Sequence, residues 1–177
     1  MENQQQPAKN IMLNYGLYLG LASILFHVIL FALGKHLEQD WKVSVISLAI
    51  SAVLIVLGIK KYKEVNNGIL TFGQGLKTGI GIAMVSSVIY IIYTLIFMNI
   101  ISPESMEQGL EIARQKLLDN PNMTDEMIEN AIAMQKKMSG PAFLIPIMLI
   151  FSLFFGFVIS LIATLIMKKT DEEITSI

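Results

Sequence analysis

The 177-residue chain contains no cysteine, and only 15% of its residues are charged. Without cysteine it can form no disulfide, has no thiolate nucleophile and offers no thiolate to a metal. Its two histidines, His27 and His36, lie in different segments, so a histidine-based zinc site is not expected either. A soluble domain of this size usually carries about a quarter charged residues. The shortage of charge therefore points away from an ordinary soluble domain.

The few charges also narrow the classes of function. The formal net charge of −1 gives no general attraction for nucleic acid. No nucleophile lies beside a base, and no paired carboxylates lie within an apolar run. We therefore expect a protein that is not an enzyme, with no catalytic residues, no cofactor and no metal site.

Four long apolar runs make up most of the sequence, at about 11–33, 43–59, 72–101 and 142–167. A bilayer core about 30 Å thick needs about 20 helical residues to cross. In lipid every backbone polar group must be satisfied, and a barrel would need shorter, alternating strands. The expected fold is therefore all-α: one integral membrane domain over residues 1–177, built as a four-helix bundle. The polar, glutamine-rich residues from Met1 to Asn10 are expected to form a disordered tail.

A polar segment separates the third and fourth runs, and its apolar residues recur at helical spacing. Ser102 and Thr124 are each followed by the pattern of a capped helix start, which predicts helices at about 103–118 and 125–138. We expect these two amphipathic helices to pack against each other and the bundle end. They would do so through two apolar stripes: Met106, Leu110, Ala113 and Leu117, and Met127, Ala131, Met134 and Met138.

The stretch from Tyr62 to Gly79 joins the second and third runs and carries the most unusual chemistry. Asn67 and Gly68 favour a helix end, and Thr71 and Gln74 have the spacing of a capping box. Its glycines match neither a P-loop nor a dinucleotide motif. Lysines around a helix N-terminus predict contacts to anionic lipid headgroups, or alternatively simple anchoring of the topology. The candidate headgroup contacts are Lys60, Lys61, Lys63 and Lys77.

Small residues recur every four positions in three of the runs. Close backbone approach through small residues drives helix association in lipid, so these positions predict helix-packing seams. The seam residues are Gly16, Gly20, Gly75, Gly79, Ala83, Gly156 and Ser160. His27 is the titratable residue placed well inside a run. We expect it to be neutral and hydrogen-bonded to a neighbouring helix, with proton sensing as the alternative.

Orientation follows from the lysines that directly abut the runs: Lys60, Lys61, Lys168 and Lys169. Positive residues are enriched on the cytoplasmic side of membrane proteins. The sequence therefore predicts that both termini are cytoplasmic and that the amphipathic pair lies on the opposite side.

Several of these features together resemble a known family. They are the Lys60-Lys61 pair, Tyr62-Lys63, Asn67-Gly68, Thr71-Phe72-Gly73-Gln74-Gly75 with Gly79, and the closing Ile159-Ser160-Leu161-Ile162 with Lys168-Lys169. The pattern is similar to the bacterial four-span membrane proteins catalogued as domain of unknown function number 4199. The resemblance covers about Asn10 to Lys169, and it implies a single domain in a bacterial inner membrane. It implies no activity and no binding residue.

Three functions are consistent with the sequence. The first is a structural or accessory membrane protein that associates with itself or another membrane protein through the seams. The second is a subunit of a small oligomeric transporter or channel, with a water path lined by Asn14, His27 or Asn99. The third is a module that binds anionic lipid. The expected partners are the bilayer and other membrane proteins.

Overall fold

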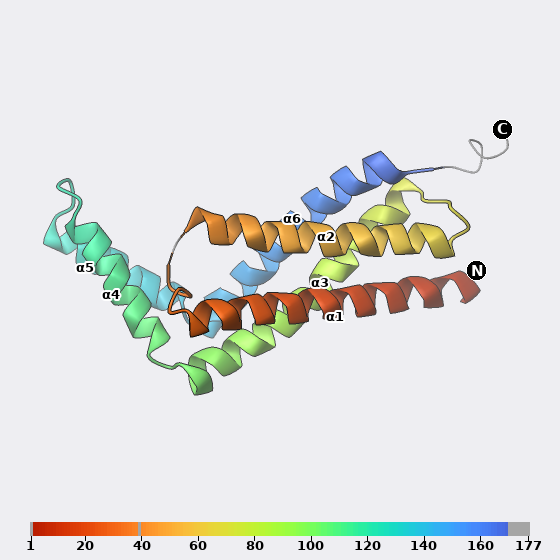
Figure 1. Cartoon of the computed structure of the whole chain (residues 1–177). Helices are drawn as coiled ribbons and strands as arrows, with labels where there is room; N and C mark the ends of the chain where they lie inside the picture. The colour runs from red at the N-terminus through yellow and green to blue at the C-terminus, as the bar shows by residue number, and fades with distance from the viewer. Residues whose placement is uncertain (1, 39, 170–177) are drawn as a thin grey trace.

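The computed structural model describes residues 2–38 and 40–169, with side chains from Ala8 onward. These residues form six α-helices and one π-helical turn (Figure 1). The elements are α1 (Glu2–Ala32), α2 (Trp41–Val65), α3 (Phe72–Ile96), the π turn η1 (Phe97–Ile101), α4 (Ser105–Leu118), α5 (Asp125–Met138) and α6 (Pro141–Met167). The expected all-α fold is confirmed.

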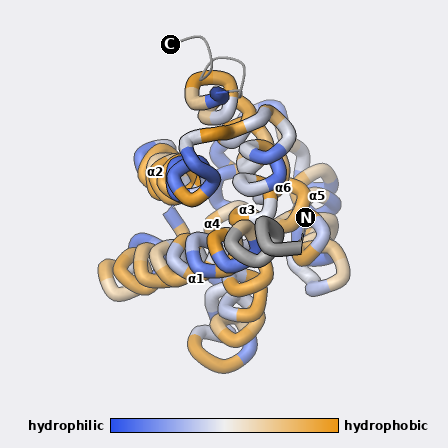
Figure 2. The backbone as a smooth tube through the Cα atoms, turned by 90° about the vertical axis from the view of Figure 1, so that its right-hand side faces the viewer, coloured by the Kyte–Doolittle hydropathy of each residue, from blue (hydrophilic) through white to orange (hydrophobic). Residues whose placement is uncertain are grey.

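Four helices are long and apolar enough to cross a membrane: α1 from Ala8, α2, α3 with η1, and α6. Hydrophobic residues run along much of their length (Figure 2), and many large side chains face outward, including Leu25, Val53 and Ile150. Such a surface is stable only where lipid replaces water. The start of α1 and the end of α6 lie at the same end of the bundle, with α4 and α5 beyond the other end (Figure 1).

Helix α3 is the centre of the bundle, because it contacts α1, α2 and α6. Helix α2 also contacts the other three, whereas α1 and α6 lie at opposite corners without an extensive contact. The most deeply buried apolar side chains are Ile55 and Ile59 of α2, Ile82 of α3 and Leu70 between α2 and α3. The tight core therefore lies in the half of the bundle nearer the start of α1.

The expectation of a disordered N-terminal tail is wrong for the described residues 2–10, because α1 begins at Glu2. Glutamine, alanine, lysine and glutamate have good helix propensity. A helix already nucleated by the apolar run can extend through them at little cost. The acidic end of the chain, at 170–177, lies outside the described residues.

The turn between α2 and α3 has the predicted chemistry. Asn67 and Gly68 adopt left-handed backbone angles, with φ of 55° and 80°. Thr71 forms the predicted capping box with Gln74: each residue's backbone N–H donates to the other's side-chain oxygen. This turn also pairs with the end of α6, through hydrogen bonds of 2.9 and 3.0 Å between the backbones of Leu70 and Lys169.

The helical hairpin of α4 and α5 begins two residues later than predicted. Thr124 caps α5 as expected, accepting from the Met127 backbone N–H. Ser102 does not cap α4, whose first residue is Ser105. Its backbone N–H donates to the Phe97 carbonyl and closes η1, and its hydroxyl donates to the Glu104 carboxylate.

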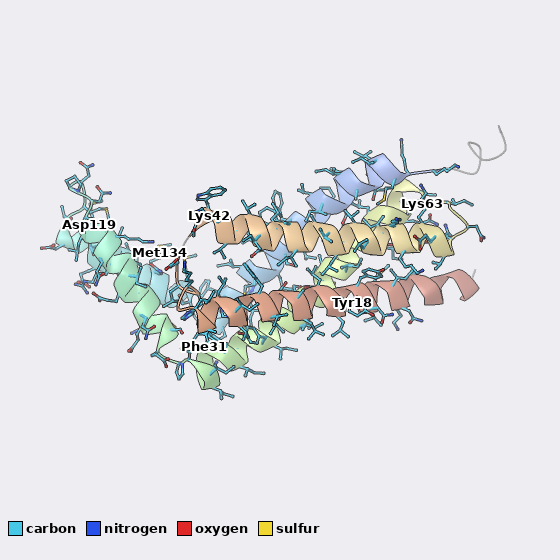
Figure 3. All side chains as sticks on the ribbon, viewed as in Figure 1. Tyr18, Phe31, Lys42, Lys63, Asp119 and Met134 are labelled. Atoms are coloured by element: carbon cyan, nitrogen blue, oxygen red, sulfur yellow. The ribbon has the colours of Figure 1, made fainter. Side chains whose placement is uncertain are left out.

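The apolar stripe predicted for α5 is also wrong. Ile128 is the buried side chain of α5, at 3% exposure, whereas Met134 is 64% exposed. The contact face is thus rotated by about one residue from the methionine stripe. Helix α5 contacts α4, with Arg114 and Glu129 paired between them, and contacts α6. The labelled Met134 and Asp119 lie on this hairpin, outside the bundle (Figure 3).

Candidate functional site

The seams predicted in α3 and α6 face each other in the structure. A Cβ atom added to Gly79 would lie 2.6 Å from Ser160 Cβ, and one added to Gly75 would lie 2.6 Å from Thr164 Cγ2. A Cβ atom added to Gly156 would overlap Ala83. The two backbones approach as closely as they do because these positions carry little or no side chain.

The seam of α1 packs on a different face of α3. A Cβ atom added to Gly16 would lie 2.5 Å from Val85 Cβ, and one added to Gly20 would lie 2.9 Å from Ile89 Cγ2. All seven seam residues therefore lie at crossings between helices of this one chain. They hold the bundle together and are not open to a partner.

The four candidate headgroup lysines are in different situations. Lys63 Nζ donates to the Met167 carbonyl at 2.7 Å, at the C-terminal end of α6 (Figure 3). Lys61 pairs with Glu64 at 3.3 Å. Lys60 and Lys77 are exposed. Two of the four are thus engaged within the protein, and the headgroup contact stays a prediction.

A cavity of about 650 Å³ lies between the four long helices, in the half of the bundle nearer α4 and α5, and it is open at the side where Leu48, Phe151 and Phe155 are exposed. The side chains on one face of α2 explain why the cavity forms. Towards the C-terminal end this face carries Ile55, Gly58 and Tyr62, which are buried. Towards the N-terminal end the same face carries serines, Ser44, Ser47 and Ser51, which line the cavity. The face changes from packing side chains to small polar ones, so the helices leave a space.

Polar groups converge on this cavity from all four helices. The lining hydroxyls and imidazoles come from Ser23, His27, His36, Ser44, Ser47, Ser51, Ser86, Ser87, Tyr90 and Ser152, while the remaining lining residues are apolar or glycine. None of the described residues that line it is Asp, Glu, Lys or Arg. An apolar pocket with a few convergent polar groups is the usual form of a small-molecule site.

His27 lies in an aromatic cluster at the side of the cavity. Its Nδ1 is 2.8 Å from the Tyr93 hydroxyl of α3, the interhelical hydrogen bond expected for this residue. Its ring packs edge to face on Phe97 and Tyr90, with centroids 4.8 and 6.4 Å away. If the tyrosine hydroxyl donates to Nδ1, the proton of the neutral imidazole lies on Nε2, which is then a hydrogen-bond donor.

His36 connects the membrane-spanning part to the hairpin. Its Nε2 lies 3.1 Å from the Ser105 hydroxyl, which lies 2.7 Å from the Ser102 hydroxyl. Ser102 donates to the Glu104 carboxylate at 2.6 Å. The only arrangement that satisfies every link is a chain of donors running from His36 through both serines to Glu104. In the neutral ring His36 Nδ1 is then an acceptor. This atom is buried without a partner among the described residues.

The Glu104 carboxylate is the acceptor at the end of this chain. The hydrogen bond from Ser102, together with one from its own backbone N–H, lowers the pKa of Glu104. Nearby His36 acts in the same direction. This series of hydrogen bonds, from His36 to Glu104, is therefore strongest when the Glu104 carboxylate is ionised.

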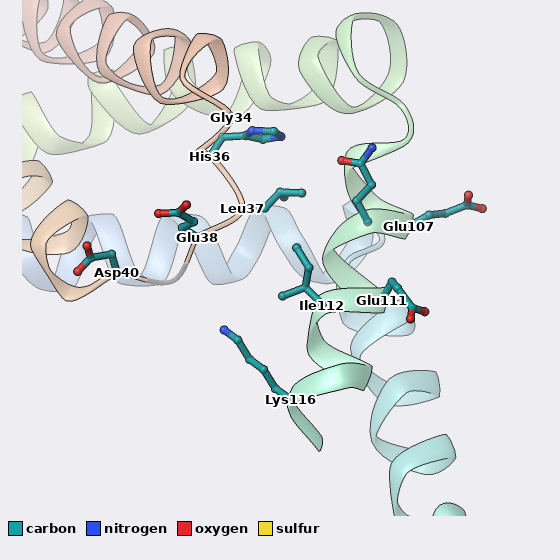
Figure 4. A pocket seen from close by; sticks show the side chains of 10 residues that line it. Gly34, His36, Leu37, Glu38, Asp40, Glu107, Glu111, Ile112 and Lys116 are labelled. Carbon is teal, nitrogen blue, oxygen red and sulfur yellow. The ribbon is translucent and has the colours of Figure 1, made fainter. Parts of the chain in front are cut away.

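His36 also lines a second, open groove of about 1060 Å³ between the α1–α2 turn and α4. Four carboxylates border this groove, from Glu38, Asp40, Glu107 and Glu111. The Lys116 side chain extends towards the turn that carries Glu38 and Asp40 (Figure 4). His36 is thus shared by the groove outside the bundle and the cavity within it.

A family model described as "Protein of unknown function (DUF4199)" matches residues 14–169. The chain belongs to this family. The match begins in α1, ends at Lys169 beside the Leu70 pairing, and contains every residue that lines the cavity. The cavity is therefore formed entirely by the DUF4199 region. No curated protein and no solved structure matches the chain.

Sequence reasoning missed most of this site. Asn14 and Asn99, expected beside a water path, do not line the cavity. The Asn99 side-chain amide instead donates to the backbone carbonyl of Leu95 at 2.7 Å. The available signal was the register of Ser44, Ser47 and Ser51 with Ile55 on one face of α2. A serine stripe continuing a packed face indicates a polar space inside the bundle.

Proposed function

We propose that this chain is an accessory protein of the bacterial inner membrane, without enzyme activity, that binds a small molecule in the cavity between its four helices. The observation that carries the proposal is Ser86, which lines the cavity and is only 6% exposed. Its hydroxyl has no hydrogen-bond partner among the residues that the structure describes. A hydroxyl on the wall of a cavity that has no partner in the protein is available to donate a hydrogen bond to a bound molecule.

Association with a second copy or another membrane protein, the leading expectation from sequence, would need other surfaces than the seams. Those seams are filled by the chain's own helices. The surfaces left for a partner are the outward faces of the spans and the exposed methionines of α5, Met127, Met134 and Met138. Such association is compatible with ligand binding and is a separate proposal.

A transporter or channel subunit is the second candidate, because the cavity could be one half of a path. The other half is closed by Ile55, Ile59 and Ile82, which are almost fully buried. A molecule could cross only if these side chains separated. Binding requires no such movement and is the better supported function.

Native mass spectrometry of the full chain released from detergent tests the binding proposal. We expect a retained small molecule in the wild type and its loss in Ser47→Phe, which fills the cavity from α2. Val53→Phe, on a lipid-facing position of α2 outside the cavity, should retain it. Equal occupancy in all three proteins, or an empty wild type after extraction from native membranes, would contradict the proposal.

A further inference from the structure

We infer that the bound molecule is an uncharged lipid whose polar end carries oxygen acceptors, held by hydrogen bonds from Ser86 and Tyr90 of α3. This inference rests on the proposed function and adds the chemical class of the ligand and the residues that recognise it.

The lining excludes a charged ligand. Every described residue around the cavity is apolar, a serine, a tyrosine or a histidine, and none carries a permanent charge. A phosphate, carboxylate or ammonium placed there would lose its hydration without gaining an opposite charge. Such a loss exceeds what a few hydroxyl groups return. The molecule must therefore be neutral.

Ser86 differs from the other two buried serines of the membrane-spanning helices, Ser87 and Ser160, which both donate to a carbonyl of their own helix. Ser23, Ser51 and Ser87 each donate to a carbonyl three or four residues earlier in their own helix, at 2.8 to 3.0 Å. That back-bonding is how a serine is normally satisfied in a membrane helix. Ser86 makes no such bond within the described chain, although it is as deeply buried as Ser87. Its hydroxyl is left for a group inside the cavity.

Tyr90 supplies a second donor, one helical turn after Ser86 and on the same face of α3. No partner for its hydroxyl exists among the described side chains and backbone. By contrast, the Tyr93 hydroxyl is hydrogen-bonded to His27 Nδ1, at 2.8 Å. Two hydroxyl groups without partners among the described residues favour a ligand end that is rich in hydroxyl or carbonyl oxygens.

The rest of the lining suits a hydrocarbon chain. Phe151 and Phe155 of α6, Phe26 of α1 and Leu48 of α2 face the cavity from three helices. A volume of about 650 Å³ holds a lipid's polar end and the first part of its chains. The bilayer is the source we assign, because a freely soluble polar molecule would not use these apolar walls.

The test uses the full chain, purified in detergent and stripped of retained molecules, with three probes. Dioctanoylglycerol is uncharged, dioctanoyl phosphatidic acid has the same chains with a charged head, and glycerol has no chains. We expect dioctanoylglycerol to bind, phosphatidic acid to bind at least about tenfold more weakly, and glycerol not to bind. Occupancy is read by native mass spectrometry over a range of probe concentrations.

Two neighbouring serines provide a matched pair of variants. Ser86→Ala should weaken dioctanoylglycerol binding about fivefold, because one hydrogen bond is lost. Ser87→Ala, at a neighbouring position of the cavity wall, should weaken it clearly less than Ser86→Ala, because the Ser87 hydroxyl already donates to the Met84 carbonyl. Tyr90→Phe, which keeps the ring, should weaken binding to a similar degree. A thermal unfolding curve for each variant checks that the fold is retained.

The outcomes separate this inference from the proposed function. If the wild type retains a molecule that Ser47→Phe expels, but phosphatidic acid binds as well as dioctanoylglycerol, the uncharged class is wrong and the binding site stands. Equal effects of Ser86→Ala and Ser87→Ala would overturn the assigned residues. Binding of glycerol with the affinity of dioctanoylglycerol would overturn the assignment to a lipid. If no variant or probe changes occupancy, both proposals fail together.

Discussion

Ser86 and Ser87 are neighbours in α3 with the same small exposure and different hydrogen bonding. Ser87 donates to a carbonyl of its own helix, whereas Ser86 has no partner among the described residues. The same contrast applies to glycines: Gly79 lies against Ser160, and Gly73 has open space around it. In the sequence each pair looks alike. What distinguishes the members is the direction in which each position faces, and that depends on the neighbouring helices.

Gly79→Ala should lower the free energy of unfolding by about 1–3 kcal/mol, because the added methyl group overlaps Ser160 across the α3–α6 crossing. Gly73→Ala is the control. It lies in the first turn of α3 with nothing near its added Cβ, so it should be neutral or slightly stabilising. Thermal unfolding in detergent, followed by circular dichroism, measures both. A Gly79→Ala protein as stable as Gly73→Ala would contradict the close packing described for α3 and α6.

The hydrogen bond from Ser102 to Glu104 should make the α3–α4 junction sensitive to acid. The bond lowers the pKa of Glu104 in the folded protein relative to the unfolded chain. Its contribution to stability is therefore present above the unfolded pKa and is lost as the pH falls through the folded pKa. An NMR titration of the Glu104 carboxyl should show a higher pKa in Ser102→Ala than in the wild type. An unchanged pKa would mean that another group holds the carboxylate.

Each helix could be predicted as an element because the signals for it are local. Run length, the left-handed Asn67 and Gly68, and the caps at Thr71 and Thr124 are properties of a few consecutive residues. The predictions that were wrong concern positions whose structure depends on contacts with residues of another element. Ser102 forms hydrogen bonds with Glu104 and Ser105 instead of capping α4. In α5 the buried side chain is Ile128, and the methionines are exposed. The cavity was missed for the same reason, since it depends on which side chains of α1, α3 and α6 lie opposite the serines of α2.

The end of α6 depends on α2, because Lys63 Nζ bonds to the Met167 carbonyl beside the Leu70–Lys169 pairing. A cation at a helix C-terminus is worth up to about 1 kcal/mol. Lys63→Met should therefore speed amide exchange of Lys168 and Lys169 about fivefold. Lys60→Met, at an exposed position of α2, should leave both rates unchanged. Hydrogen–deuterium exchange measures the difference, and equal rates in the two variants would show that Lys63 does not hold this end.

At the scale of the whole molecule, the four-span architecture was evident from composition alone. A chain with long uncharged runs and few charges has few folds open to it in lipid. Which helices touch was not evident, because every span is apolar around most of its circumference. The small residues lie at two crossings of α3, one with α6 and one with α1, and only the assembled bundle shows which seam packs against which helix.

The predicted orientation can be tested directly, since the natural chain has no cysteine to interfere. Val65→Cys lies at the end of α2, and Asn130→Cys lies on α5 beyond the opposite end of the bundle; both positions are exposed. With cytoplasmic termini, a membrane-impermeant maleimide should label Asn130→Cys in intact cells. Val65→Cys should react only after permeabilisation. The reverse pattern of labelling would place the termini on the other side.

The close contact between α3 and α6 has a consequence for the order in which the protein is made. Helix α3 is synthesised before the 39 residues from Ser102 to Gly140 and before all of α6. Through that interval Gly75, Gly79 and Ala83 have no Ser160 or Gly156 to pack against. The nascent chain thus exposes to lipid a surface that the finished protein conceals. A chaperone that binds this protein during its insertion would bind this surface of α3, and it would dissociate when α6 packs against α3.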